Sequence, residues 1–292
     1  MSTTKRSLPE LIAMKQRGEK ITVVTAYDAP SARLADAVDI DMILVGDSAA
    51  MAVLGHESTV PITVDEMIML TRAVARGTRR ALIMADMPFG SYQVSDTRAL
   101  ENAVRLVKDG RADAVKVEGA GETLARVAAI VDAGIAAVGH IGLTPQSATL
   151  LGGYKAQGRT AADARRLHAA ALALQSAGCV AIVLEAIPSA VAAHITRSLR
   201  IPTIGIGSGV ACDGQVLVWH DVLGLTQGRM PRFVKQYANL SATIQAALSA
   251  YVADVRGARF PEPQHTYAMA DDEADLFESE TAAPSELVKK SG

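Results

Sequence analysis

Cysteine is scarce in this chain. Only two cysteines, Cys179 and Cys212, occur among 292 residues, and they lie far apart without the spacing of a metal site or a redox motif. This scarcity argues against a disulfide framework and against a cysteine-ligated metal. We interpret both residues as small buried hydrophobic side chains in a reducing cytoplasm.

The chain also lacks long apolar runs and an excess of charge of either sign. No run approaches the roughly 20 apolar residues of a membrane span, and the first twenty residues lack the apolar stretch of a secretory signal. We therefore expect a cytoplasmic protein with no membrane partner. The net charge of -2 and the scattered lysines and arginines give no reason to expect a nucleic-acid partner.

Eight short apolar runs recur along the chain, and a helical pattern follows most of them. Strands that are nearly all apolar and alternate with helices predict a parallel sheet covered on both faces. Eight such units, in a chain close to the roughly 250 residues that the fold needs, favour an α/β chain closed into a (β/α)₈ TIM barrel over an open sheet. The eighth run is the weakest, because only a short link separates it from the seventh. The predicted strands are 21–27, 41–47, 81–86, 114–119, 135–142, 180–187, 202–209 and 216–224, with helices at 63–77, 96–110, 160–178 and 189–200.

The sequence changes character after about residue 232. Residues 233–260 predict a long C-terminal helix that packs on the barrel or on a neighbouring subunit, so we assign residues 1–267 to a single barrel domain. Residues 268–292 contain DDEADLFESE, in which six of ten residues are acidic. This composition predicts a solvated, mostly disordered tail.

Polar residues occur repeatedly near the carboxyl ends of the predicted strands, where barrel enzymes carry their catalytic groups. Strand alternation predicts that Asp86 shares a face with Leu82 and Met84, and that Asp47 shares one with Ile43 and Val45. Charges in such apolar strands must pair, bind a cation or face a water-filled mouth. The candidates are Asp47, Ser48, Asp86, Lys116, Glu118, His140, Glu185, His220 and Asp221.

Each candidate also has a purely structural interpretation. Lys116 and Glu118 could form a structural ion pair, and His140 could be a satisfied core histidine. Three carboxylates from neighbouring strands, Asp47, Asp86 and Glu118, shift the balance toward a site for a hard cation such as Mg²⁺. The role of His220 stays open, because it depends on the weak eighth strand, and the other histidines fit the surface or helices.

The strand ends and their flanks closely resemble the ketopantoate hydroxymethyltransferase family, a group of phosphoenolpyruvate/pyruvate-type barrels. The likeness runs in unbroken order from about residue 7 to 267, and the joint occurrence of its motifs is highly specific. The sequence departs from the family pattern at GSG (207–209), where GAG is commoner, at Ala120 and in GLTQGRMP (224–231). The most telling motifs are LVGDS (44–48), MADMPFGSY (84–92), VKVEG (115–119), GHIGLTPQS (139–147) and LGGYKAQGR (151–159).

The resemblance implies a one-carbon transfer in pantothenate synthesis, with 5,10-methylenetetrahydrofolate as co-substrate and Mg²⁺ as cofactor. The donor gives a hydroxymethyl group to 3-methyl-2-oxobutanoate through a Mg²⁺-stabilised enolate, and the product is 2-dehydropantoate. The family likeness also implies a homodecamer. By the same likeness Glu185 is the proton acceptor, the 2-oxo acid is held by Asp47, Ser48, Asp86, Lys116 and His140, and the metal by Asp47, Asp86 and Glu118.

Two other functions compete with this one. An isocitrate-lyase-type lyase on a related barrel would also handle a metal-bound 2-oxo acid, but such enzymes carry a catalytic cysteine on a mobile loop. Neither Cys179 nor Cys212 lies in such a loop. A catalytically silent binding barrel is disfavoured because all the strand-end groups are retained.

Overall fold

The structure is a computed structural model that describes residues 4–228 and 230–281. The chain divides into two compact units, residues 1–239 and 240–292, and each is described by itself. Within the described residues, no helix is both long enough and apolar enough to cross a membrane.

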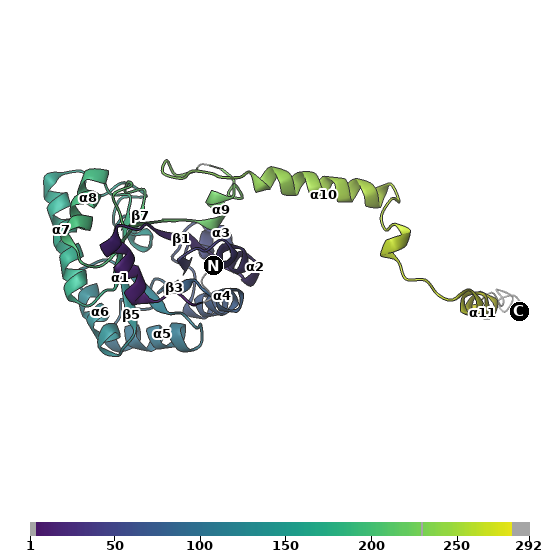
Figure 1. The fold of residues 1–292 in the computed structure, drawn as a ribbon, viewed down its shortest axis with the longest axis horizontal. Helices are drawn as coiled ribbons and strands as arrows, with labels where there is room; N and C mark the ends of the chain where they lie inside the picture. Colours follow the sequence, from purple (N-terminus) through teal and green to yellow (C-terminus); the bar gives the residue numbers. More distant parts are fainter. Residues whose placement is uncertain (1–3, 229, 282–292) are drawn as a thin grey trace, which may run out of the picture. The chain divides into compact units, whose positions relative to one another are not determined.

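The first unit is a closed barrel of eight parallel strands, each hydrogen-bonded to its neighbours in sequence order, with β8 paired to β1. Figure 1 shows helices such as α5, α6 and α7 around strands of this barrel. This confirms the predicted TIM barrel. The strands are β1 Ile21–Thr25, β2 Met42–Val45, β3 Leu82–Asp86, β4 Ala114–Glu118, β5 Ala136–Gly142, β6 Ala181–Glu185, β7 Thr203–Ile206 and β8 Gly214–Leu217.

Helices surround the barrel, and local sequence signals define their ends. Helix α4 begins with a capping box, in which Thr63 accepts a hydrogen bond from the Glu66 N–H and the Glu66 carboxylate accepts one from the Thr63 N–H. The helices of this unit are α1 Leu8–Arg17, α2 Ala29–Ala37, α3 Ala49–Ala52, α4 Val64–Gly77, α5 Asp96–Lys108, α6 Thr123–Asp132, the 3₁₀ turn η1 Pro145–Ser147, α7 Ala161–Ser176, α8 Ser189–Ser198 and α9 Trp219–Val222.

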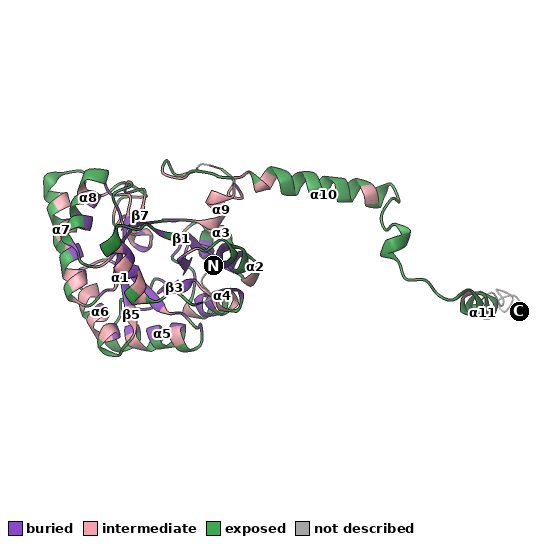
Figure 2. Cartoon of the chain, in the orientation of Figure 1, coloured by how far each residue is buried: buried purple, intermediate pink, exposed green. Residues whose placement is uncertain are grey.

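Two apolar clusters fill the barrel unit, and both are buried (Figure 2). The smaller cluster is the barrel interior, where alternate residues of the strands, such as Met84 and Val183, meet Leu11 and Met14 of α1. The larger cluster lies between the outer strand faces and the helices, and it includes Ile43. Successive strand residues point alternately into the barrel and toward the helices, so the leucine, isoleucine, valine and methionine side chains of one strand supply both clusters.

The end of the barrel differs from the prediction for 216–224. Strand β8 begins at Gly214 and ends at Leu217, so His220 and Asp221 lie on the short helix α9 rather than on a strand. The Trp219 N–H donates to Thr25 Oγ1 at 2.9 Å, which draws the chain out of the sheet at this point. A side chain at Gly214 would meet the Ile21 carbonyl oxygen at 2.5 Å, so only glycine permits this strand pairing.

The second unit contains α10 (Leu240–Arg256), the 3₁₀ turn η2 (Pro263–His265) and α11 (Asp271–Thr281). The predicted helix 233–260 begins only at Leu240, directly after Asn239, a residue type preferred at helix starts. Part of the predicted disordered tail is helical, because α11 spans Asp271–Thr281 with three acidic residues in its first turn, where they suit the helix dipole. The helix has no buried residue, and residues 282–292 of the predicted tail lie outside the described part.

Candidate active site at the barrel mouth

Asp47 and Asp86 meet at the carboxyl ends of β2 and β3. The Asp47 N–H donates to Asp86 Oδ2 at 3.0 Å, and both side chains are buried. Asp86 lies on the inward face of β3, as predicted. For β2 the predicted alternation is wrong, because Ile43 and Val45 face the helices. Asp47 reaches the site because the strand ends at Val45 and the chain turns after it.

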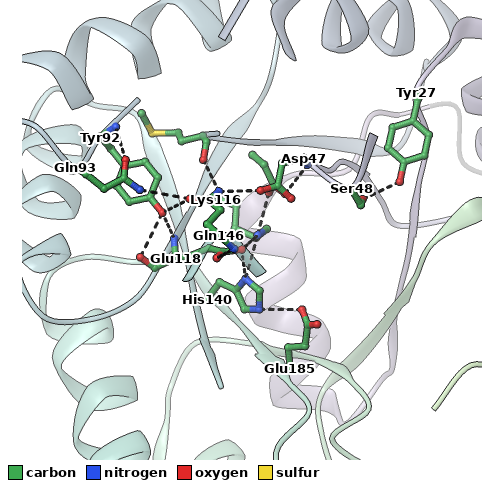
Figure 3. Close-up of polar contacts among 12 residues, drawn as sticks. Tyr27, Asp47, Ser48, Tyr92, Gln93, Lys116, Glu118, His140, Gln146 and Glu185 are labelled. Carbon is green, nitrogen blue, oxygen red and sulfur yellow. Dashed lines mark hydrogen bonds and ion pairs between the residues drawn. The ribbon is translucent and has the colours of Figure 1, made fainter. Parts of the chain in front are cut away.

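Gly46 makes room for this turn. A Cβ atom there would lie 2.7 Å from Ser48 Oγ and 3.6 Å from Asp86 Oδ2. Ser48 Oγ shares a hydrogen bond of 2.8 Å with the hydroxyl of Tyr27, which follows β1 (Figure 3). Ser48 therefore lies beside the aspartate pair.

Lys116 is the buried cation of the site. Its ammonium group lies 3.1 Å from Asp86 Oδ1 and 3.7 Å from Glu118 Oε1, and the side chain is 4% exposed. Burial lowers the pKa of Lys116, but the surrounding carboxylates outweigh that effect, so the pKa lies above its usual value. Lys116 is therefore charged at neutral pH.

His140 connects two carboxylates. Its Nδ1 lies 3.2 Å from Glu118 Oε1, and its Nε2 lies 3.2 Å from Glu185 Oε2 (Figure 3). Burial and the neighbouring Lys116 lower the pKa of His140, but the contacts with Glu118 and Glu185 prevail and raise it to about 9. The Glu185 side chain is 14% exposed, so it borders the open part of the site, whereas Glu118 is 3% exposed.

Two uncharged residues complete the cluster, and the sequence did not assign them a role. The Gln146 side-chain amide donates to Asp47 Oδ2 at 2.9 Å, and the Gln146 N–H donates to Glu118 Oε2 at 3.0 Å. The Tyr92 hydroxyl donates to Gln146 Oε1 at 2.7 Å and accepts from the Glu118 N–H at 3.2 Å. The sequence could have indicated both residues only by their positions, Tyr92 in MADMPFGSY after β3 and Gln146 in GHIGLTPQS after β5.

His220 lies at the edge of this region. Its ring centroid is 5.6 Å from that of Tyr27, and its Nδ1 is buried without a hydrogen-bond partner among the described residues. Burial lowers the pKa of His220, so the ring is neutral at pH 7. His220 thus packs against Tyr27, whose hydroxyl bonds Ser48, and lies outside the carboxylate cluster itself.

The cluster carries more negative than positive charge. Four carboxylates, from Asp47, Asp86, Glu118 and Glu185, face one ammonium and one imidazolium. Burial, followed by the charges of Asp86 and Glu118, raises the pKa of Asp47 well above its usual value. Burial also raises the pKa of Asp86, although Lys116 opposes it. The Lys116 ammonium therefore does not balance the negative charge of this aspartate pair.

The carboxylates are not equally free to bind a ligand. Among the described residues, no three histidine, cysteine or acidic side chains are arranged to hold a metal ion by themselves. Both oxygens of Glu118 are engaged, Oε1 with His140 and Oε2 with the Gln146 N–H. Asp86 Oδ1 accepts no hydrogen bond within the described chain and contacts only the charge of Lys116. Asp47 and Asp86 are thus the pair with capacity left for a cation.

A closed parallel barrel with buried, perturbed charges at its mouth defines the class of (β/α)₈-barrel enzymes. Comparison with known proteins gives the family. The family model described as ketopantoate hydroxymethyltransferase matches residues 5–263. The chain belongs to the ketopantoate hydroxymethyltransferase family.

Curated relatives support the same assignment. The 3-methyl-2-oxobutanoate hydroxymethyltransferase of Moorella thermoacetica is 56% identical over 261 residues, which cover 89% of this chain and 97% of that protein. The protein of the same name from Carboxydothermus hydrogenoformans is 54% identical over 264 residues, 90% of this chain and 96% of its own. The isocitrate-lyase-type alternative is therefore not favoured.

Solved structures share the barrel. A phosphonopyruvate hydrolase matches with a TM-score of 0.58 at 14% identity, covering 94% of this chain and 96% of its own. A 2,3-dimethylmalate lyase, described as a member of the PEP mutase/isocitrate lyase superfamily, matches with a TM-score of 0.53 at 14% identity, covering 96% and 98%. These similarities identify the fold.

Proposed function

We propose that this chain is a 3-methyl-2-oxobutanoate hydroxymethyltransferase, which transfers a hydroxymethyl group from 5,10-methylenetetrahydrofolate and forms 2-dehydropantoate. The observation that carries the proposal is the buried cluster in which Lys116 and the pair Asp47–Asp86 face Glu185 across His140. Such a cluster combines charge stabilisation with a carboxylate that can accept a proton. Family membership supports this choice of substrate.

The residues fit a divalent cation such as Mg²⁺. Asp47 and Asp86 would hold it, because burial raises the pKa of both and the charge of Asp86 adds to the rise for Asp47, which a bound cation would reverse. Glu118, whose oxygens are engaged, would act through a bound water, since Mg²⁺ usually retains several waters. When bound, the cation supplies Lewis-acid stabilisation of negative charge on the substrate oxygens.

Lys116 and Ser48 are the donors available to the 2-oxo acid. The Lys116 ammonium stabilises the charge that develops on the keto oxygen when the proton leaves C3. The Ser48 hydroxyl, oriented by Tyr27 at 2.8 Å, donates to the substrate carboxylate. The two donors together orient the substrate, with its C3 toward the open side of the site.

Glu185 takes the proton from C3, because it is the carboxylate on the open side of the cluster. His140 holds Glu185 by the contact between Nε2 and Oε2, and Glu118 orients the other side of the ring. The carbanion at C3 then bonds to the methylene carbon of the folate, and water supplies the hydroxyl group of the product. Both bonds from that carbon to the folate nitrogens break, and tetrahydrofolate leaves with the proton from C3 and one proton from water on those nitrogens. General-base catalysis of this kind contributes typically about 10²–10⁴-fold.

The Glu185→Gln variant tests this assignment. Exchange of the C3 proton of 3-methyl-2-oxobutanoate into D₂O can be followed by NMR without folate, which isolates proton removal from transfer. We expect exchange to slow by at least about 10²-fold, while the affinity for the 2-oxo acid in the presence of Mg²⁺ changes little. Glu122→Gln, at the start of α6 and outside the cluster, is the matched control. Exchange at the wild-type rate in Glu185→Gln would remove Glu185 from the role of base.

We also propose that the enzyme is cytoplasmic and assembles as a homodecamer, with residues 1–267 as the catalytic domain. Helix α10 supports self-association, because Ile244, Leu248, Tyr251 and Val255 form an exposed apolar stripe with helical spacing. Sedimentation velocity of the full chain measures the assembly, and a monomer at micromolar concentration would contradict it.

A further inference from the structure

A pocket of about 320 Å³ lies on the side of the barrel where the loop after β3 leaves the sheet. The start of α4, the loop that follows β3 and the face of α5 with Arg98 and Arg105 form its walls, and Val64, Phe89 and Ser91 are also among the lining residues. We propose that this pocket binds the glutamyl carboxylates of the folate co-substrate. The proposal rests on the function proposed above and assigns the far end of the same co-substrate.

Arg98 supplies the charge that a carboxylate needs. The other arginine of the pocket, Arg105, is already paired with Asp65. Among the described residues no carboxylate pairs with the Arg98 guanidinium, which is exposed on α5. Guanidinium groups bind carboxylates with two parallel hydrogen bonds, so Arg98 is suited to a carboxylate ligand.

Ser91, which lines the pocket, has a buried hydroxyl group without a partner among the described residues. The residue is 3% exposed, and its Oγ has no hydrogen-bond partner within the described chain. The Asn102 side-chain amide donates to the Ser91 carbonyl oxygen at 2.7 Å, which fixes the backbone of this loop against α5. A buried hydroxyl without a partner is costly unless a ligand satisfies it.

The start of α4 provides a third attraction for an anion. The helix has 14 residues, and the side chain of Thr63 caps the Glu66 N–H. The N–H groups of Val64 and Asp65 have no acceptor within the helix and lie at its positive end. An arginine, a buried hydroxyl and a helix start thus converge on one pocket, and together they favour a carboxylate.

The loop that lines the pocket also reaches the reaction centre through hydrogen bonds. Ser91 is followed by Tyr92, whose hydroxyl bonds Gln146, and Gln146 in turn bonds Asp47. A reduced folate carries its one-carbon unit at the pterin end and its glutamyl carboxylates at the other, with an aminobenzoyl ring between. Phe89, which is 46% exposed on the pocket wall, offers an aromatic face for that ring.

The test compares two co-substrates in the Arg98→Gln and Ser91→Ala variants. One is 5,10-methylenetetrahydrofolate, and the other is the carboxamide of the corresponding tetrahydropteroate, which lacks the glutamyl group and carries no carboxylate. With the folate, Arg98→Gln should raise KM about tenfold or more and Ser91→Ala severalfold, with kcat nearly unchanged. With the pteroate carboxamide, both variants should match the wild type, because the carboxylate that they would contact is missing already.

Arg165→Gln, an exposed arginine on α7, is the control for a general loss of charge. Equal changes in KM for both co-substrates, or no change for either in Arg98→Gln, would overturn the pocket assignment. Exchange of the C3 proton without folate tests the underlying function separately. If the wild type does not exchange that proton and does not transfer, the proposed function fails, whatever Arg98 does.

Discussion

Replacing Lys116 by Met should destabilise the barrel by about 3–5 kcal/mol, the usual cost of breaking a buried ion pair by removing one partner. The ammonium lies 3.1 Å from Asp86 Oδ1 and 3.7 Å from Glu118 Oε1. At an effective dielectric constant of about 20, these separations correspond to interactions of about 4 to 5 kcal/mol each. The cost of removing the ammonium group from water offsets part of this, so the net loss is smaller than the sum.

The loss of stability in Lys116→Met should grow as the pH rises. Without Lys116, the pKa of Asp86 rises further above its usual value, because burial raises it and the main opposing charge is gone. A carboxyl group whose folded-state pKa is raised makes the folded state less stable as pH rises above the unfolded-state value. We therefore expect Lys116→Met to lose more stability relative to wild type at pH 8 than at pH 5.

Urea unfolding at the two pH values, in buffer with chelator, measures both effects. Lys108→Met, an exposed lysine in the last turn of α5, is the matched control and should change the free energy of unfolding by less than about 0.5 kcal/mol. A loss below about 1 kcal/mol in Lys116→Met would refute the ion-pair reasoning. A loss that is equal at pH 5 and pH 8 would refute the electrostatic origin.

Three further outcomes follow from the same structure. Mg²⁺ at 100 times its Kd should stabilise the folded wild type by about 2.7 kcal/mol and so raise its thermal midpoint. Asp47→Ala should abolish both this rise and turnover. An undiminished rise in the variant would exclude Asp47 as a ligand. Ser208→Ala should lower the free energy of unfolding by about 1–2 kcal/mol and slow exchange of the C3 proton. The reason is that Ser208 Oγ donates to the Leu184 carbonyl and accepts from the Ile187 N–H, which lie on either side of Glu185 in the sequence. Unchanged exchange would mean that these hydrogen bonds do not position Glu185. Ending the chain at Ala268 should leave turnover and thermal midpoint nearly unchanged, because α11 buries no side chain, and a loss of activity or of assembly on a sizing column would contradict that.

The sequence alone predicts most of the barrel, because apolar strands that alternate with helices have few other ways to bury both faces. It fails where a tertiary contact ends an apolar run. The residues Val216 to Val222 continue the strand pattern, yet a hydrogen bond from the Trp219 N–H to Thr25, 194 residues away in sequence, ends β8 at Leu217. No local pattern could reveal this contact.

The charged part of the site is predictable for a different reason than the uncharged part. A lysine or a glutamate in an apolar strand is conspicuous, since its burial demands a partner, and Lys116 and Glu118 were found in this way. Gln146 follows β5 in a 3₁₀ turn, where an amide side chain has no such demand. Its importance depends on a bond to Asp47, 99 residues earlier, which exists only once the barrel has closed.

The inward-facing residues of the strands change from apolar to acidic at the barrel mouth, and this change links the fold to the chemistry. Interior positions lower in the barrel hold Leu82, Met84 and Val183, whereas the last inward positions of the same strands hold Asp86 and Glu185. Apolar residues at those last positions would pack without any cost of burying charge. The site instead keeps carboxylates that lack a full set of countercharges, as the raised pKa of Asp47 records. Such an arrangement fits the cation and the charged substrate that we propose for this site, because it gives up stability of the empty barrel for binding at its mouth.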